Sequence, residues 1–260
     1  MTSKFLKMGL AATMACTMVA CSSQPAATEE GSEEAVTITI GVSPDYAPYE
    51  SKDTDGNIVG FDPDMVAWFE EYLTEEEGKT YNLEFKEMSF DNIITQLQGD
   101  QIDLGVSGFT YSEERAVEWS DPYIKTAQVA VVPEGSSITS IDDLKGKHLA
   151  AQTGATGEIA ANEVEDATVS SVQNVQDIFT GLSANQYDAA IVDLGVGKQY
   201  VESGSFTMVD GTLLDEENYI VAKEGNTEMI DLINKCIAAF TESEDYLTLC
   251  DQYDLLPLEK

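Results

Sequence analysis

Gly105-Val-Ser-Gly-Phe-Thr-Tyr-Ser-Glu-Glu-Arg-Ala-Val-Glu-Trp-Ser-Asp-Pro-Tyr123 begins inside an apolar run, Ile102 to Val106, that predicts a short buried strand. Small and hydroxylated residues come next, followed by one arginine, Arg115. The whole chain has 13 Lys+Arg against 48 Asp+Glu, so an arginine just beyond a strand end calls for an explanation. The stretch therefore predicts a polar site at the end of a buried strand.

Arg115 is predicted to bind a carboxylate. Its planar guanidinium, beside the hydroxyls of Ser107 and Thr110 and free backbone N–H groups, would form a fork-shaped receptor for the two oxygens of that group. The alternative is a surface arginine paired with Glu113 or Glu114. Position alone leaves both interpretations open.

The first twenty residues predict a signal segment. Lys4 and Lys7 form a basic start, and Met8 to Ala20 is an apolar stretch too short to span a bilayer. It ends in Met18-Val-Ala-Cys21, which resembles the lipobox of bacterial lipoproteins, so Cys21 is the expected lipidation site. Cys16 fits that pattern less well, and an ordinary secreted protein cut nearby is the alternative.

Residues 21–35 are predicted to form a flexible tether, because Ser22 to Ala35 contains no large apolar residue that could be buried. Without Lys4 and Lys7 the formal charge of −35 becomes about −37. This excess of negative charge disfavours nucleic acid and anionic membrane surfaces as partners. We interpret the acidity itself as a contribution to solubility.

The remaining sequence alternates between strand and helix patterns. Val36 to Val42 alternates as a first strand, and two prolines force Ser43 to Tyr49 into a loop. A helix is expected to begin with Asp62 as N-cap and Pro63 as its first residue. Further strands are expected at 81–85, 102–106, 127–132, 147–151, 167–172, 188–192 and 219–222, and further helices at 93–97, 155–164, 175–182, 226–240 and 244–253. This alternation predicts an α/β fold with a mainly parallel sheet covered by helices on both faces.

A short internal similarity favours two lobes of similar build. Leu97-Gln-Gly-Asp-Gln-Ile-Asp103 and Leu182-Ser-Ala-Asn-Gln-Tyr-Asp188 both join an apolar helix end to an aspartate and an apolar strand. The match places Asp193 after its strand much as Arg115 lies after the earlier one. Because ligand groups are expected outside the carboxyl ends of sheet strands, Arg115 would face Asp193 across a cleft. Such a pair suits a zwitterion.

Cysteine and histidine usage does not favour a metal or a cofactor. Cys236 and Cys250 fall in helical patterns, where a disulfide and two free buried thiols are both consistent with the sequence. His148 has no histidine or cysteine cluster near it. The sequence therefore predicts neither a zinc site nor a catalytic histidine, and we expect no metal and no cofactor. We also expect a monomer.

Several motifs together resemble the extracytoplasmic solute-binding proteins of amino-acid ABC transporters (family 3), such as the histidine-binding and the lysine/arginine/ornithine-binding proteins. The resemblance runs from about Ile38 to Tyr253, and the order of the motifs makes it specific. They are Ile40–Glu50 (IGVSPDYAPYE), Gly60–Asp64 (GFDPD), Glu114-Arg115, Trp119–Tyr123 (WSDPY), Asp143–Lys147 (DLKGK), Gln152–Glu158 (QTGATGE) and Asp188–Asp193 (DAAIVD).

The resemblance implies a two-lobed, type II periplasmic-binding-protein-like fold whose strands cross between the lobes twice. Residues 36–126 and 219–260 would form lobe 1, and residues 127–218 would form lobe 2. It implies a protein without chemistry of its own, which closes about a hinge on an L-amino acid. The closed form would deliver that ligand to an ABC importer, made of a permease and its ATPase. The binding protein itself would lie outside the cytoplasm, anchored to the membrane by lipid.

The resemblance also implies roles for the ligand-binding residues. Arg115 would bind the α-carboxylate with Thr110 and Thr156, and Asp193 would accept the α-ammonium group with Ser107 or the Gly108 carbonyl. The full set expected at the ligand is Ser43, Asp45, Tyr46, Phe90, Ser107, Gly108, Phe109, Thr110, Arg115, Gln152, Ala155, Thr156 and Asp193.

Structural roles remain alternatives for three of these residues. Tyr46 and Phe90 would flank the ligand side chain, but Phe90 is also suited to be the first core residue of its helix. Tyr46 is equally suited to packing under its loop. Asp193 would be a fitting cap for a helix that follows it, a role compatible with ligand binding.

Departures from the family pattern bear on the choice of ligand. Ser43 stands where members for cationic or glutamine side chains often carry Asp. Gly108 replaces a frequent serine and Ala155 a frequent threonine. We therefore expect a polar or neutral amino acid rather than a strongly cationic one. The groups that could partly compensate are Gln152, Asp45 and Glu50.

Two other functions are alternatives. An extracytoplasmic dehydratase acting on arogenate-like or prephenate-like acids resembles these proteins, and it would need a general acid near the leaving hydroxyl. Asp45, Glu50 and Glu158 are candidates for that acid, but the sequence singles out none of them. A component that presents its ligand to a sensor is the second alternative.

Overall fold

The computed structural model of the protein describes residues 35–259, which fall within one compact unit. The predicted signal segment, Cys21 and the tether up to residue 34 lie outside the described residues. Among the residues described, no helix is long and apolar enough to cross a membrane.

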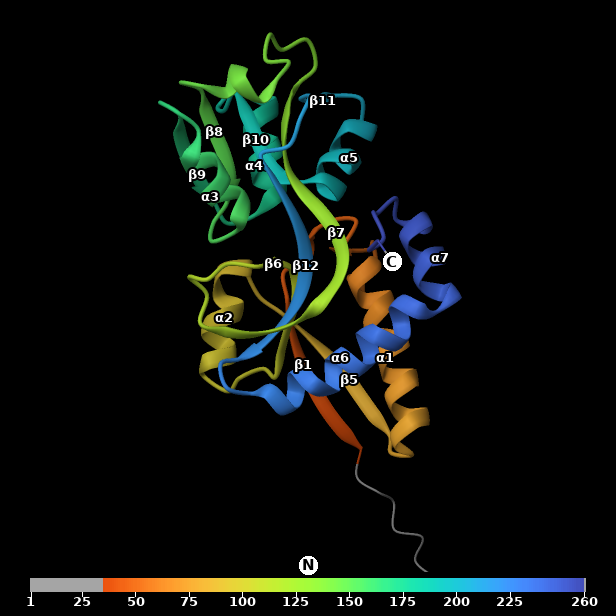
Figure 1. The fold of residues 1–260 in the computed structure, drawn as a ribbon. Coiled ribbons are helices and arrows are strands. Elements are labelled where there is room, and N and C mark those ends of the chain that lie inside the picture. The colour runs from red at the N-terminus through yellow and green to blue at the C-terminus, as the bar shows by residue number, and fades with distance from the viewer. Residues whose placement is uncertain (1–34, 260) are drawn as a thin grey trace, which may run out of the picture. The chain divides into compact units, whose positions relative to one another are not determined.

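The chain alternates between strands and helices, and Figure 1 shows them gathered in two lobes. The strands are β1 (Val36–Val42), β2 (Asp45–Tyr46), β3 (Glu50–Lys52), β4 (Ile58–Val59), β5 (Tyr81–Glu87), β6 (Leu104–Thr110), β7 (Val117–Pro133), β8 (His148–Gln152), β9 (Thr168–Val172), β10 (Ala189–Asp193), β11 (Phe206–Met208) and β12 (Leu214–Lys223). The helices are α1 (Phe61–Glu77), α2 (Phe90–Gln98), the 3-10 turn η1 (Ile141–Leu144), α3 (Thr156–Glu163), α4 (Val175–Ser183), α5 (Leu194–Glu202), α6 (Thr227–Glu242) and α7 (Glu244–Gln252).

One large sheet runs through both lobes in the order β5-β1-β6-β12-β7-β10-β8-β9, with β11 beside β7. Pairing is parallel within β5-β1-β6 and within β10-β8-β9. It is antiparallel wherever β7 or β12 takes part. The prediction of a mainly parallel sheet was therefore wrong for the middle of the sheet, because two long strands join the parallel sets of the two lobes.

Strand β7 is longer than predicted. It covers Val117 to Pro133 in 17 residues, whereas the sequence pattern indicated a strand only over 127–132. Pro122 lies inside it, where the register with β12 shifts between Asn218 and Tyr219, so the missing N–H is tolerated at an irregularity. Since β7 and β12 run through both lobes (Figure 1), the lobe boundaries at 126/127 and 218/219 stay a prediction.

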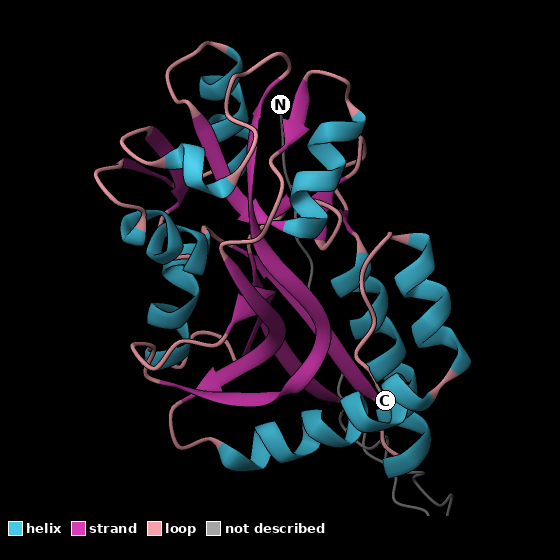
Figure 2. Cartoon of the chain, turned by 45° about the horizontal axis from the view of Figure 1, so that its top comes forward, coloured by secondary structure: helices cyan, strands magenta, loops and turns pink. Residues whose placement is uncertain are grey.

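Helices cover both faces of the sheet, as Figure 2 shows, and adjacent residues of one strand pack into different cores. In the first lobe, α1 and α6 contribute to one core and α2 to another. In the second lobe, Ala190 and Val192 face the core of α4 and α5, while Ala189 and Ile191 face the core of α3. This alternation follows from the period of two in a strand. The α/β fold class is confirmed.

Helix α1 does not begin as predicted. It starts at Phe61 with Gly60 as N-cap, and Asp62 makes no cap. Gly60 has φ 140°, and a Cβ there would lie 2.2 Å from the Tyr49 carbonyl oxygen, so only glycine fits. Asp62 is fully buried and accepts hydrogen bonds of 3.0 and 3.1 Å from the Tyr123 hydroxyl. A tertiary partner therefore replaced the local cap that the sequence suggested.

The internal similarity is confirmed in the structure. After α2, the N–H of Asp100 donates to the Leu97 carbonyl, and after α4 the N–H of Asn185 donates to the Leu182 carbonyl. Both turns use a positive φ, 53° at Asp100 and 56° at Asn185. The aspartates that follow repeat the match, since Asp103 accepts from the Thr39 N–H at 2.7 Å and Asp188 from the His148 N–H at 2.8 Å. The turn that leads into β6 is thus repeated before β10.

Cys236 and Cys250 are free thiols, both buried in the core of the C-terminal helices. Burial raises the pKa of Cys236 to about 12 and that of Cys250 to about 11. Both thiols are therefore expected to be unreactive in the folded protein.

Candidate functional site

A small cavity lies where strands β6 and β10 end and helices α2 and α3 begin. It has a volume of about 10 Å³, scarcely room for one water molecule. Its lining contains ten of the thirteen residues predicted at the ligand, from both lobes: Tyr46, Phe90, Ser107, Gly108, Thr110, Arg115, Gln152, Ala155, Thr156 and Asp193.

Arg115 is held by both lobes. Its Nη1 donates to the Thr110 carbonyl at 2.6 Å, and its Nη2 donates to the Gly154 carbonyl at 2.7 Å. The guanidinium carbon lies 5.6 Å from the centre of the Phe90 ring and 5.4 Å from that of Phe109. Burial lowers the pKa of Arg115 to about 10, so it remains charged at neutral pH. It forms no ion pair with Glu113 or Glu114, so the alternative of a surface pair is wrong.

Asp193 is the acidic counterpart in the cavity. Its carboxylate is 2% exposed, and Oδ1 accepts a short hydrogen bond from Gln128 Nε2. Oδ2 has no partner at hydrogen-bond distance among the described residues. Burial, with the charge of Glu216, raises the pKa of Asp193 to about 7. Asp193 also precedes α5 at the N-cap position, but its side chain makes no capping hydrogen bond.

Hydrogen bonds between the lobes close the cavity. The hydroxyls of Thr110 and Thr156 lie 2.6 Å apart, and the backbone N–H of Asp193 donates to the Tyr46 hydroxyl at 3.2 Å. An amino acid needs far more space than this cavity offers, so the two lobes must separate before such a ligand can enter.

Three of the predicted residues lie outside the cavity lining. Phe109 is fully buried and packs against Phe90, with ring centres 4.7 Å apart. The Ser43 hydroxyl donates to Asp45 Oδ1 at 2.8 Å, and Asp45 Oδ2 accepts from the Val175 N–H at 2.7 Å. Asp45 therefore joins the loop after β1 to the first residue of α4.

Gly108 and Phe90 have the conformations that their positions require. Gly108 has φ 56°, a region that favours glycine. Phe90 is the first residue of α2, belongs to a core cluster and lines the cavity, so its two predicted roles coexist.

The sequence did not single out two polar residues beside the cavity, Gln128 and Glu216. Gln128 Nε2 donates to Asp193 and, at 2.8 Å, to Glu216. Glu216 also accepts from the Thr156 hydroxyl at 3.0 Å. Gln128 could have been found as a polar residue within the apolar run 127–132. Glu216 had no such signal in a chain rich in acidic residues.

A buried carboxyl pair supports the cavity from behind. Glu50 and Asp62 are both fully buried, and they lie close enough for their charges to repel each other. Burial raises the pKa of Asp62 to about 7, and burial together with the charge of Asp62 raises that of Glu50 well above its ordinary value. Glu50 Oε1 accepts from the Ser107 hydroxyl at 2.7 Å, which orients this cavity residue.

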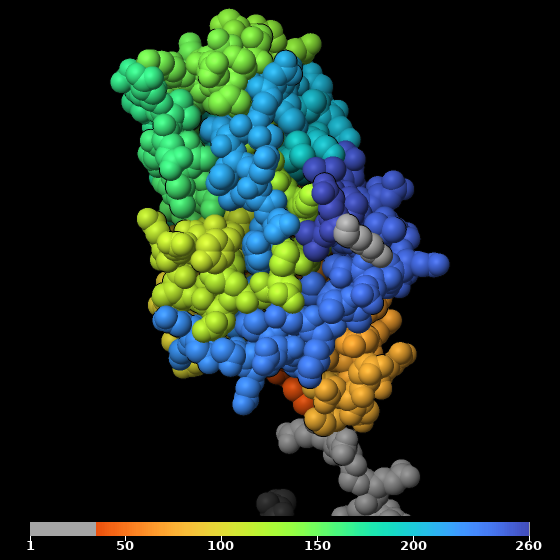
Figure 3. Space-filling view, in the orientation of Figure 1, coloured from red at the N-terminus to blue at the C-terminus, as the bar shows by residue number. Residues whose placement is uncertain are grey.

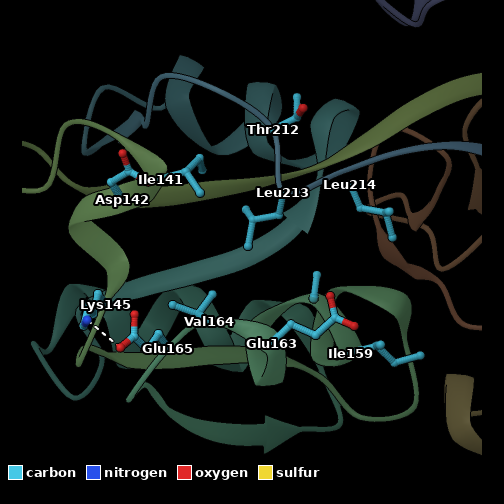
Figure 4. Close-up of a pocket in the computed structure, with 11 residues that line it drawn as sticks. Ile141, Asp142, Lys145, Ile159, Glu163, Val164, Glu165, Thr212, Leu213 and Leu214 are labelled. Carbon is cyan, nitrogen blue, oxygen red and sulfur yellow. Dashed lines mark ion pairs between the residues drawn. The ribbon is translucent and has the colours of Figure 1, made fainter.

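Larger hollows lie elsewhere on the molecule. The pocket in Figure 4 has a volume of about 590 Å³ and lies on the second lobe, where Ile141, Val164 and Leu213 face its interior. Its lysine, Lys145, is paired with Glu165 at 2.6 Å, so the pocket offers no free cation for a carboxylate. None of the residues predicted at the ligand lines it. This pocket therefore does not offer the free cation that a zwitterion site needs.

Two lobes joined by crossing strands, with an arginine and an aspartate in a cavity that they share, define a two-lobed ligand-binding protein. The sequence profile of the bacterial extracellular solute-binding proteins, family 3, matches residues 38–255. The chain belongs to this family, whose relatives are amino-acid-binding proteins of ABC transporters. A curated relative is the arginine-binding extracellular protein of Bacillus subtilis (strain 168), 31% identical over 251 residues that cover 93% of each chain.

Solved structures agree with the assignment to this family. The substrate-binding protein of an amino acid ABC transporter matches with a TM-score of 0.77 at 30% identity, covering 84% of this chain and 98% of that chain. An ancestral arginine-binding protein, solved with arginine and with glutamine, is 32% identical. It matches with TM-scores of 0.76 and 0.74 and covers 84% of this chain and 97% of its own. The two-lobed type II fold is confirmed.

Proposed function

We propose that the protein captures a free L-amino acid between its lobes and delivers it to an ABC importer. One observation carries this proposal: Arg115 and the unpartnered Oδ2 of Asp193 belong to the same closed cavity. Each of these charged groups is largely removed from water, so each gains from an opposite charge. The α-carboxylate and the α-ammonium group of one amino acid supply both charges.

We propose a polar or neutral side chain for the ligand. Of the residues that line the cavity, Asp193 alone is acidic, and it is assigned to the ammonium group. The carboxylate of Asp45 is occupied by Ser43 and by the N-terminus of α4. No further lining carboxylate is left for a cationic side chain, whereas Gln152 can hydrogen-bond a polar one.

We further propose that the protein is held at the outer face of the cell membrane by a lipid on Cys21, and that it acts as a monomer. The lipobox-like Met18-Val-Ala-Cys21 supports the anchor. The intact mass of the membrane-associated protein tests it. A diacylglycerol-modified N-terminal Cys21 is expected, and an unmodified N-terminus at another residue would contradict it.

The dehydratase alternative receives no support from the position of its candidate acids. Asp45 and Glu50 are not part of the cavity lining, since Asp45 accepts from the Val175 N–H and Glu50 accepts from the Ser107 hydroxyl behind the cavity. Glu158 accepts from the Gly154 N–H at 2.7 Å and from the Ser171 hydroxyl. A general acid has to reach the leaving hydroxyl within hydrogen-bond distance or through one water.

A thermal-shift screen against the proteinogenic amino acids, followed by calorimetry, tests the proposed function. A ligand that binds only the folded state raises the melting temperature, so polar neutral amino acids should give the largest shifts. Selective binding of a cationic amino acid would overturn the side-chain assignment. Turnover of arogenate without amino-acid binding would overturn the proposed function in favour of an enzyme.

A further inference from the structure

Glu216 lies on β12, one of the two strands that cross between the lobes. Its Oε2 accepts hydrogen bonds from Thr156 Oγ1 at 3.0 Å and from Gln128 Nε2 at 2.8 Å. The hydroxyl of Thr110 lies 2.6 Å from that of Thr156, and the guanidinium of Arg115 is close enough to Glu216 for their charges to attract. The groups around Glu216 thus come from both lobes and from the other crossing strand, β7.

The groups around Glu216 are the groups assigned to the ligand carboxylate. Thr156 donates to Glu216 in this structure, and Thr110 and Arg115 lie beside this contact. A hydroxyl carries one hydrogen, so Thr156 can donate to Glu216 or to a ligand carboxylate, but not to both. The two carboxylates therefore compete for at least one donor.

Charge adds to this competition. A ligand carboxylate bound at Arg115 would bring a second negative charge close to the half-buried Glu216. Like charges at short range repel strongly when little water screens them. Glu216 therefore disfavours binding of the ligand carboxylate as long as its side chain keeps its present position.

A groove beside Glu216 can accommodate its side chain in another orientation. It also lines an open groove of about 640 Å³ between the crossing strands and the C-terminal segment, together with Lys125, Asp215 and Leu256. Residues around β12 are exposed at the waist between the lobes in the space-filling view (Figure 3). Rotation of the side chain into this groove would return the carboxylate to water and leave Thr156 free.

We propose that Glu216 is an affinity-setting residue that competes with the ligand α-carboxylate for Thr110, Thr156 and Arg115, and swings into the groove when an amino acid binds. The proposal rests on the proposed function, because it assigns these donors to an amino-acid carboxylate. The side chain holds the closed lobes together from inside and so lowers the apparent affinity for ligand. Residues at such a position tune affinity without contacting the ligand.

Calorimetry on Glu216→Gln tests the competition. L-Glutamine, L-histidine and L-arginine serve as probes, and the variant should bind the best of them about threefold or more tightly than the wild type. Glu216→Ala should do the same. Asp215→Asn is the matched control, since it removes one negative charge from the next residue, whose carboxylate accepts from Thr212. Weaker or unchanged binding by the Glu216 variants, or equal tightening by Asp215→Asn, would overturn the proposal.

A ligand without a carboxylate sharpens the test. The amide of the best-binding probe lacks the negative charge that Glu216 repels, so Glu216→Gln should improve its affinity less than that of the amino acid. An equal gain for the amide would contradict the competition.

Small-angle scattering tests the other half of the proposal without a ligand. Ligand-free Glu216→Ala should have a larger radius of gyration than the ligand-free wild type, because the closed state has lost the acceptor of the Thr156 hydroxyl. An unchanged radius would overturn the proposal. If none of the probes binds the wild type, the proposed function fails by itself, while scattering still decides whether Glu216 holds the lobes closed.

Discussion

The backbone N–H of Val175 in the second lobe donates a 2.7 Å hydrogen bond to the carboxylate of Asp45 in the first lobe. Val175 is the first residue of α4, where N–H groups have no partner within the helix and the helix dipole favours an anion. Asp45 therefore stabilises the closed arrangement of the lobes without belonging to the cavity lining.

Asp45→Ala should weaken ligand binding about tenfold. A hydrogen bond to a charged group contributes about 1.5–3 kcal/mol, and hydration in the open state returns part of that. The loss should appear as faster dissociation at an unchanged association rate in stopped-flow fluorescence. Asp45→Asn keeps an acceptor oxygen and should lose less. Slower association as the main effect would contradict a role in closure.

Arg115→Ala should reduce amino-acid affinity about a hundredfold or more, because removal of one partner of a desolvated charge pair costs about 3–5 kcal/mol. Arg115→Lys is the matched variant, since it keeps the charge but loses the planar fork. Calorimetry should show that lysine restores only part of the affinity. Near-normal affinity of the alanine variant would rule out the carboxylate assignment.

Ligand affinity should fall as the pH is lowered below about 7. Burial and the charge of Glu216 raise the pKa of Asp193 to about 7, and only the ionised carboxylate can pair with the ammonium group. Below that pH, binding must release one proton from Asp193, so affinity should drop about tenfold per pH unit. Titrations at pH 8, 7, 6 and 5 measure the slope. Asp193→Asn should bind weakly, and its affinity should not depend on pH in this way. A wild-type affinity that does not change between pH 8 and pH 5 would contradict the assignment.

The ligand-free protein should become more stable as the pH is lowered from 8 to about 5. Burial raises the pKa of Asp62 to about 7 from an ordinary value of 3.8, and the pKa of Glu50 is raised as well. Between these pH values the folded state binds more protons than the unfolded state, so the free energy of unfolding decreases as pH rises. The melting temperature followed against pH measures the effect.

Asp62→Asn is the control for this pH dependence. The amide can still accept from Tyr123, and it should flatten the curve between pH 5 and pH 7. A wild-type melting temperature that rises with pH over the same range would show that the pair is not protonated in the folded state. The pKa of Asp193 adds to the same trend in both proteins.

Local patterns in the sequence predicted most of the elements and much of the site. The turns after Leu97 and Leu182 were recognised as similar, and they share their hydrogen bonds and a positive φ. Such turns and amphipathic helices depend on residues close together in the chain, so their pattern is visible without the fold. Family motifs then indicated Arg115 and Asp193, and both line one cavity.

The tertiary structure alone decided which polar groups meet. Asp45 and Val175 are 130 positions apart in the chain, and Thr156 and Glu216 are 60 apart. Asp62 was predicted to be a local cap but accepts from Tyr123, and β7 extends over residues 117–126, for which no strand was predicted. These contacts depend on how the crossing strands bring the lobes together, and no pattern of neighbouring residues records that geometry. The class of protein could therefore be predicted from the sequence, whereas the contacts between distant polar groups exist only in the folded chain.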